Sequence, residues 1–234
     1  VMADRVASRA PGQHILAASS PTDAAVEALR SLRTAVQFAM LDSTNNRVLI
    51  TGATPGVGKS FISANFAAVM ANAGKRVLLI DADMRKGHLN QYFGISRDSG
   101  LSDAIAGAIP RDQAIKRSVL PSLDFIPTGA LPPNPAELLG SRAFTNLLEA
   151  LGNDYDLVVI DSAPVLVAAD TLSIANLAAI LLLVARSDLT SIGDIHESPR
   201  RLAHARKTPS GILFNALDLN RRHYGRYGGY RYGY

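Results

Sequence analysis

Short runs of apolar residues alternate with longer segments of helical periodicity along most of the chain. The runs lack the strict apolar–polar alternation of a half-exposed strand, so they predict strands that are buried on both faces. Strands of this kind, separated by helices, predict an α/β fold with a mostly parallel sheet and helices on both faces. We expect strands over residues 47–51, 76–81, 123–127, 156–161, 179–185 and 211–217. Helices are expected over residues 20–40, 59–73, 134–151, 170–177 and 190–206, with short helices around 101–117.

Three segments are predicted along the chain. Residues 1–19 show no sustained periodicity and form a loose N-terminal lead-in, residues 20–219 form one domain, and residues 220–234 form a Tyr-rich tail. Ser20 is expected to cap the first long helix, with Pro21 in its first turn and Asp23 near its positive end. Because the chain begins with Val1, we expect it to be a fragment of a longer protein.

The charge of the chain is concentrated at its end. The last fourteen residues contain four Arg and no acidic residue, which accounts for the whole net charge of +4. The remaining body is near neutral, so a general electrostatic attraction to nucleic acid is not expected. The absence of Cys excludes disulfides and thiolate metal sites. No apolar run approaches the ~18 residues that a membrane span needs.

The same fourteen residues hold five of the seven Tyr of the chain, interspersed with Gly and Arg. A segment of this composition has no apolar residues to bury and should remain disordered by itself. Its phenols could stack on RNA, associate as low-complexity sequence, or accept phosphate groups. The tyrosines are Tyr224, Tyr227, Tyr230, Tyr232 and Tyr234.

Residues 52–60 fit the pattern G-x-x-x-x-G-K-[ST] between a predicted strand and a predicted helix. In such a loop the backbone N–H groups and the helix N-terminus surround a phosphate, so this is a P-loop NTPase-type fold. Lys59 is expected to reach the β- and γ-phosphates of ATP, and Ser60 to bind Mg²⁺. An accidental Gly-rich turn is the alternative, and the strand–loop–helix context makes it improbable. The other residues expected at the nucleotide are Gly52, Thr54, Pro55, Gly56, Val57, Gly58 and Phe61.

Two later strands end in acidic residues. Asp81 ends one strand, with Asp83 just beyond it, and Asp161 ends another. The carboxyl ends of parallel strands converge on the ligand crevice of an open α/β sheet, so we expect the three carboxylates beside the phosphates. A divalent cation would be needed between these like charges, and Ser60, Asp81 and Asp161 are the expected ligands. For each Asp taken singly, a helix cap or turn residue is the alternative.

Partitioning and septum-placement ATPases share these acid-terminated strands, and a protein of that kind, dimerising on a surface, is the alternative function. Their signature Lys directly after the first loop Gly is replaced here by Ala53. The chain instead resembles the bacterial tyrosine kinases, the cytoplasmic catalytic domains of polysaccharide co-polymerases. The resemblance covers roughly residues 22–234. It rests on residues 51–60, 78–87, 155–166 and 131–141, the Glu27–Arg30–Arg33 pattern and the Tyr cluster.

The resemblance implies an ATP- and Mg²⁺-dependent protein-tyrosine autokinase that regulates exopolysaccharide or capsule export. In the family the equivalent of Asp81 activates the tyrosine hydroxyl, that of Asp83 is needed for activity, and that of Asp161 supports the Mg²⁺ site. Arg85 would neutralise phosphate or hold Asp83, or else form a surface salt bridge. Asn215 would contact the purine or cap its strand. Where some relatives have a regulatory Tyr this chain has His88, so the nearby Tyr92 is expected to be a packed aromatic.

The resemblance also implies partners. Glu27, Arg30 and Arg33 share one helical face, which would contact a neighbouring subunit in a ring, an octamer by resemblance, although an intrahelical Glu27–Arg30 pair explains them equally well. The five tail tyrosines would be the phosphoacceptors for that neighbour's active site. A membrane-spanning activator segment absent from this chain would hold it at the inner membrane, and a low-molecular-weight tyrosine phosphatase would reverse the reaction. No nucleic-acid partner is expected.

Overall fold

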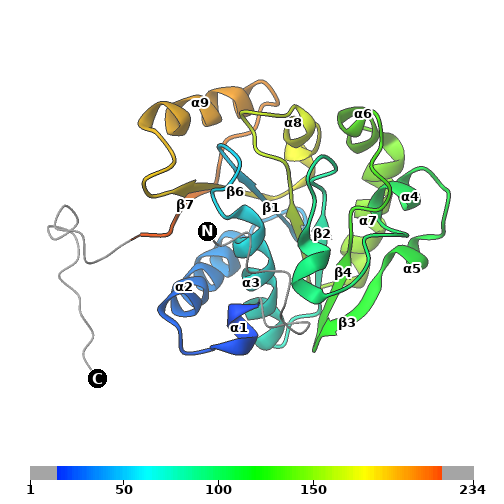
Figure 1. Ribbon diagram of the computed structural model, residues 1–234, viewed down its shortest axis with the longest axis horizontal. Helices are drawn as coiled ribbons and strands as arrows, with labels where there is room; N and C mark the ends of the chain where they lie inside the picture. Colours follow the sequence, from blue (N-terminus) through cyan, green and yellow to red (C-terminus); the bar gives the residue numbers. More distant parts are fainter. Residues whose placement is uncertain (1–14, 218–234) are drawn as a thin grey trace, which may run out of the picture.

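The computed structural model describes residues 15–217. Its centre is a seven-stranded sheet with the order β3-β4-β2-β5-β1-β6-β7 (Figure 1). All neighbouring strands are parallel except β3, which runs antiparallel to β4 at one edge. The predicted mostly parallel α/β fold is therefore confirmed. The strands are β1 (Arg47–Gly52), β2 (Val77–Asp81), β3 (Lys116–Leu120), β4 (Leu123–Ile126), β5 (Leu157–Asp161), β6 (Ile180–Arg186) and β7 (Gly211–Asn215).

The central strands are apolar throughout because both of their faces are covered. Val48 and Ile50 of β1 point into one hydrophobic cluster, while Leu49 between them points into the other. The first cluster packs under α1 (Leu16–Ser19), α2 (Ala24–Ala39), α3 (Lys59–Asn72) and η2 (Leu89–Phe93). The second packs under α4 (Leu101–Ile105), α5 (Arg111–Ala114), α6 (Pro135–Leu139), α7 (Arg142–Asp154), α8 (Asp170–Ile174), η3 (Ala175–Leu177) and α9 (Ile192–Ala203).

The structure differs from the expected elements in several local respects. Residues 16–19, placed in the loose lead-in, form the short helix α1, because Ile15 and Ala17 are buried against the first cluster. The first long helix is capped by Asp23, whose side chain accepts a hydrogen bond from the Ala25 N–H, and not by Ser20. The expected helix over 134–151 is divided into α6 and α7 at Gly140 and Ser141, and Ser141 caps α7.

The strand β3 was not expected. Its residues are half-buried or exposed, and it pairs with β4 alone as an edge strand. An edge strand with one covered side does not show the continuous apolar run that predicts a central strand. The predicted boundaries of the domain at residues 20 and 219 stay predictions, and the Tyr-rich segment lies outside the described residues. No helix within residues 15–217 is both long and apolar enough to cross a membrane.

Candidate active site

The phosphate loop joins β1 to α3 at the carboxyl edge of the sheet. Gly58 has a φ of +92°, which favours glycine, and a Cβ there would collide with the side chain of Asn215. Asn215, at the end of β7, donates from Nδ2 to the Val57 carbonyl oxygen at 2.8 Å. On its other side Arg186 Nη1 donates to the Gly56 carbonyl oxygen at 3.0 Å. The loop is therefore held by the two neighbouring strand ends, β6 and β7.

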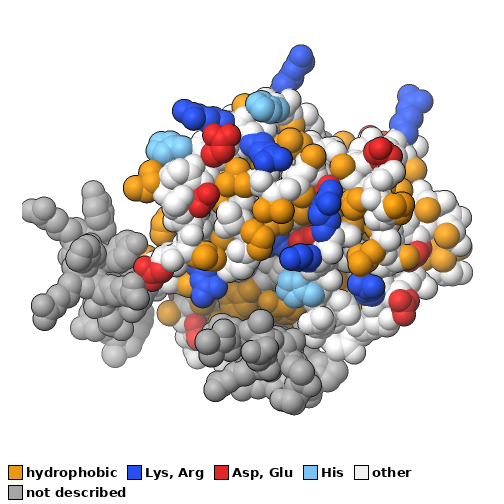
Figure 2. All heavy atoms as spheres, turned by 45° about the horizontal axis from the view of Figure 1, so that its top comes forward, with side chains coloured by type: hydrophobic (Ala, Val, Ile, Leu, Met, Phe, Trp, Pro, Cys, Tyr) orange, Lys and Arg blue, Asp and Glu red, His pale blue; other side chains and the backbone are white. Residues whose placement is uncertain are grey.

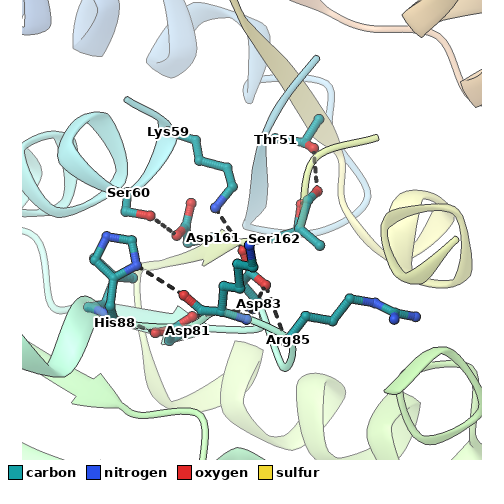
Figure 3. Close-up of polar contacts among 12 residues, drawn as sticks. Thr51, Lys59, Ser60, Asp81, Asp83, Arg85, His88, Asp161 and Ser162 are labelled. Atoms are coloured by element: carbon teal, nitrogen blue, oxygen red, sulfur yellow. Dashed lines mark hydrogen bonds and ion pairs between the residues drawn. The ribbon is translucent and has the colours of Figure 1, made fainter. Parts of the chain in front are cut away.

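Lys59 and Asp83 form a buried ion pair at the mouth of this loop (Figure 3). Lys59 Nζ donates to Asp83 Oδ2 at 2.9 Å. Burial lowers the pKa of Lys59, but the charges of Asp161 and Asp83 outweigh burial, so its pKa lies above the ordinary value. Burial raises the pKa of Asp83, but Lys59 outweighs this and holds it below the ordinary value. Both groups are therefore charged at neutral pH.

Asp81 and Asp161 lie side by side because β2 and β5 are paired with these two residues in register. Each side chain is buried, with 1% of the residue exposed. Ser60 Oγ donates to Asp161 Oδ2 at 2.7 Å, and Ser63 Oγ donates to Asp161 Oδ1 at 3.0 Å. Asp81 accepts from the Asp83 N–H at 3.2 Å and from the Leu89 N–H at 3.0 Å.

The two adjacent carboxylates resist being charged together. Burial, and then the charge of Asp161, raise the pKa of Asp81 to about 7. Burial also raises the pKa of Asp161, against the opposing effect of Lys59. Oxygen atoms from Ser60, Asp81 and Asp161 form the kind of hard, anionic donor set that a divalent cation such as Mg²⁺ accepts. Within residues 15–217 no three His, Cys, Asp or Glu side chains form a metal site by themselves.

Arg85 does not hold Asp83 through its side chain. Its guanidinium forms two hydrogen bonds to the buried carboxylate of Asp170, from Nε at 2.7 Å and from Nη2 at 3.0 Å. Only the Arg85 backbone N–H reaches Asp83 Oδ1, at 3.3 Å. Asp170 opens helix α8 and lies 85 residues away along the chain, so no local pattern indicated this pair.

A cavity of about 350 Å³ opens between the phosphate loop and the segment after β2. Pro164, Val167 and Ala168 form an apolar wall, and Lys59 and Asp83 also line the cavity. Arg85, Lys86 and His88 line the cavity from the segment after β2. Hydrophobic and basic side chains lie side by side on the face of the molecule shown in Figure 2.

Phe61 and Tyr92 lie against the first hydrophobic cluster, and Glu27 and Arg30 lie on α2. Phe61, in the first turn of α3, packs partly against the first hydrophobic cluster and lines a groove between α2 and β7. Tyr92 also packs against that cluster, and burial raises the pKa of its phenol to about 12, as for a packed aromatic. On α2, Glu27 and Arg30 form an intrahelical pair at 2.8 Å, and both side chains are exposed. Sequence reasoning missed Arg186, Ser63 and Asp170, none of which belongs to a local motif.

The fold and the site together define a nucleotide-binding α/β domain with a phosphate loop. Residues 46–197 match the family model described as AAA domain. The chain is 37% identical to the kinase domain of the Escherichia coli tyrosine kinase ETK, covering 97% of this chain and 87% of that one, with a TM-score of 0.87. It is 45% identical to the BceF tyrosine kinase domain, covering 86% and 81%, with a TM-score of 0.79. The chain therefore belongs to the family of bacterial tyrosine kinase domains.

Longer relatives contain a similar segment. The putative tyrosine-protein kinase EpsB of Ralstonia solanacearum is 52% identical over 234 residues, which is 99% of this chain but 31% of that protein. The chain thus spans about a third of the length of the curated relatives that it matches. Membership of this family implies that the domain uses a nucleotide.

Proposed function

We propose that this chain transfers the γ-phosphoryl group of ATP to tyrosine hydroxyls, including those of its own C-terminal segment, and so regulates exopolysaccharide or capsule export. One observation supports the proposal most strongly. The cavity with the apolar wall opens directly onto Lys59 and Asp83, next to the buried Asp81 and Asp161. A phenol ring needs an apolar surface, and phosphoryl transfer needs fixed charges beside it.

The phosphate loop binds the nucleotide phosphates in this proposal. The backbone N–H groups of residues 52–60 and the N-terminus of α3 supply partial positive charge. When the nucleotide binds, the Lys59 ammonium leaves Asp83 and pairs with the β- and γ-phosphates instead. Asn215 holds the Val57 carbonyl in place through one N–H of its amide, and its remaining N–H and Oδ1 would be available to the purine.

Ser60, Asp81 and Asp161 would hold Mg²⁺, which when bound neutralises phosphate charge and orients the γ-phosphoryl group. Ser60 already donates to Asp161, so the two oxygens are close enough to share one ligand. Before the nucleotide binds, Asp83 keeps its negative charge, because Lys59 holds its pKa below the ordinary value.

Asp81 is the proposed base for the tyrosine hydroxyl. A free phenol has a pKa of about 10, so it needs help to lose its proton as it attacks. Burial raises the pKa of Asp81 to about 7 in the cation-free site, and a bound Mg²⁺ would lower it again. The proposed base role therefore rests on the place of Asp81 at the carboxyl end of β2, beside Asp161. Much of the remaining rate enhancement comes from holding the phenol oxygen in line with the γ-phosphorus.

The acceptors are Tyr224, Tyr227, Tyr230, Tyr232 and Tyr234, which lie outside the described residues. Their segment follows Leu217, two residues beyond the Asn215 side chain that holds the phosphate loop. Resemblance to the family favours delivery to the site of a neighbouring subunit in a ring, with Glu27, Arg30 and Arg33 at the contact. A head-to-tail contact of this kind closes into a ring.

Membrane attachment and reversal belong to the same proposal. The curated relatives are about three times as long as this chain, since it spans 31% of EpsB, and that leaves room for a membrane-spanning activator. The kinase domain would then act on the cytoplasmic side of the inner membrane, with a low-molecular-weight tyrosine phosphatase as its counterpart.

Incubation with Mg²⁺-ATP, followed by phosphotyrosine detection, tests the proposed activity. We expect the wild-type chain to become labelled and Lys59→Met to lose at least ~100-fold of the labelling rate, as for loss of a preorganised charge at the reacting group. Lys75→Met is the matched control, because Lys75 is an exposed Lys in the turn before β2. Labelling of Lys59→Met at the wild-type rate would falsify the role of Lys59.

If the chain is instead a partitioning-type ATPase, the same incubation with Mg²⁺-ATP should give a different result. Such a protein would hydrolyse ATP without forming phosphotyrosine. Ala53 replaces the signature Lys of those ATPases, and the two kinase-domain structures match 86–97% of the chain. These observations favour the kinase.

A further inference from the structure

Thr128 carries one of only two buried side-chain polar atoms that lack a hydrogen-bond partner within residues 15–217, the other being Arg47 Nε. Thr128 follows the end of β4, and only 1% of its surface is exposed. Buried hydroxyls nearly always have a partner, since leaving one unpaired costs free energy. An unpaired hydroxyl in the interior therefore calls for a functional explanation.

The main chain around Thr128 is fixed on both sides. The Pro127 carbonyl accepts from the Leu101 N–H at 2.8 Å, and the Thr128 carbonyl accepts from the Ser102 N–H at 3.0 Å. The next residue, Gly129, donates its N–H to the Arg97 carbonyl at 3.0 Å. With the backbone held in this way, the position of the Thr128 side chain is set by the fold.

That position is beside the carboxylate of Asp81. A Cβ placed on Gly87 would lie 2.8 Å from Asp81 Oδ1 and would collide with Thr128 Oγ1. Thr128 Oγ1, Asp81 Oδ1 and the Asp83 carbonyl oxygen thus all lie within 3.0 Å of this one point, and Gly87 has no side chain to separate them. Asp81 Oδ1 accepts one hydrogen bond there, the 3.2 Å contact from the Asp83 N–H, so it can accept another.

We infer that Thr128 is a positioning residue for Asp81, whose hydroxyl donates to Asp81 Oδ1 when the acceptor tyrosine is bound. The hydrogen bond fixes the direction of the Asp81 carboxylate at the carboxyl end of β2. Thr128 itself touches neither ATP nor the phenol. This inference rests on the proposed function, because it assigns Thr128 a partner in the proposed tyrosine-activating step.

Two substitutions at Thr128 test the inference in the full chain with Mg²⁺-ATP. Thr128→Val replaces the hydroxyl with a methyl group of similar size, and Thr128→Ser keeps the hydroxyl. We expect Thr128→Val to lower kcat for phosphotyrosine formation by roughly ten-fold or more, as for a lost hydrogen bond to a charged group. The KM for ATP should stay within about two-fold of wild type, and Thr128→Ser should restore most of kcat.

Thr145→Val is the matched control. Thr145 is a half-buried threonine of α7 whose hydroxyl donates to its own helix at Ser141, on an element that does not line the cavity. Melting temperatures of all variants separate loss of packing from loss of positioning. The inference is overturned if Thr128→Val keeps the wild-type kcat, or if Thr128→Ser is as slow as Thr128→Val.

The proposed function has its own outcome in the same experiment. If the wild-type chain forms no phosphotyrosine while Lys59→Met is equally inactive, the kinase proposal fails, and this inference fails with it. If the wild type is active and Lys59→Met is not, the kinase proposal stands, and the Thr128 variants alone decide the inference.

Discussion

The carboxyl edge of the sheet and the outer face of α2 both carry charged residues that the sequence singled out, but they differ in burial. Lys59, Asp83 and Asp161 are buried and form specific pairs with one another and with Ser60. Glu27 and Arg30 are exposed and pair within one helical turn. Burying charges costs free energy even when they are paired, whereas an exposed i,i+3 pair costs almost nothing. Burial therefore supports a functional role for the charges at the carboxyl edge of the sheet. The role of the α2 face has to be tested by measuring whether it contacts another subunit.

The largest expected effect is the loss of activity in Asp161→Asn. The substitution keeps the shape of the side chain but removes the charge that the proposed Mg²⁺ site requires, so phosphotyrosine formation should fall by at least ~100-fold. Asp156→Asn is the control. Asp156 directly precedes β5, at the end of the strand opposite to Asp161, and its exposed side chain pairs with Arg76 at the surface. Equal activity in the two variants would remove Asp161 from the site.

Arg85→Met should destabilise the fold, because it leaves the buried carboxylate of Asp170 without its cation. We expect a loss of about 1–3 kcal/mol in the free energy of unfolding, less than for a fully buried pair because Arg85 is half exposed. Chemical denaturation of the single variant and of Arg85→Met/Asp170→Asn measures this, and the double variant should recover part of the loss.

The same two variants separate the roles of Arg85. If Arg85 only holds Asp170, the double variant should also recover kinase activity. If activity stays low while stability returns, the guanidinium acts on phosphate as well. A single variant as stable as wild type would show that the Asp170 pair contributes nothing.

Asp161→Asn should also raise stability in buffer without nucleotide or Mg²⁺. The pKa values of Asp81 and Asp161 are raised by burial, that of Asp81 to about 7, so the folded chain retains protons that the unfolded chain has released. Their contribution to stability therefore falls as the pH rises from about 4 to about 7. At pH 8 we expect Asp161→Asn to be ~1–2 kcal/mol more stable than wild type.

The pH dependence is the check on this explanation. The difference in melting temperature between the two chains should shrink as the pH falls through about 4, where the carboxylates of the unfolded chain also take up protons. A difference that stays constant with pH would mean that the gain comes from packing and not from charge.

The smallest expected effect on stability is at α2. Glu27→Gln removes an exposed ion pair, so the free energy of unfolding should change by less than ~0.5 kcal/mol. If this face contacts a neighbouring subunit, the same substitution should nevertheless lower the mass of the assembly measured by light scattering. An unchanged mass for Glu27→Gln and for Arg33→Ala would leave the intrahelical pair as the whole explanation.

The central strands and the phosphate loop could be predicted from the sequence because each depends on local pattern. Continuous apolar runs identify β1, β2, β5 and β6, and the loop residues are contiguous. What could not be predicted depends on distant partners or on the sheet edge. Arg85 pairs with Asp170 across 85 residues. Thr128 comes near Asp81 only because β4 pairs with β2, and β3 pairs with a single neighbouring strand.

The residue that caps α2 also could not be predicted from the local sequence. Ser20, Pro21 and Asp23 all carry start signals, and the sequence alone did not decide among them. The structure places Asp23 at the cap because residues 16–19 already form α1, so the chain turns before the long helix begins.

The central claim is that one copy's site phosphorylates the Tyr-rich segment of another copy. It is tested by mixing two chains: Lys59→Met, which has an inactive site and all five tail tyrosines, and a chain with an intact site whose five tail tyrosines are replaced by Phe. After incubation with Mg²⁺-ATP, mass spectrometry assigns phosphotyrosine to each chain. We expect label on the tail of the Lys59→Met chain. A mixture in which that tail stays unlabelled, while the wild-type chain alone becomes labelled, would contradict transfer between subunits.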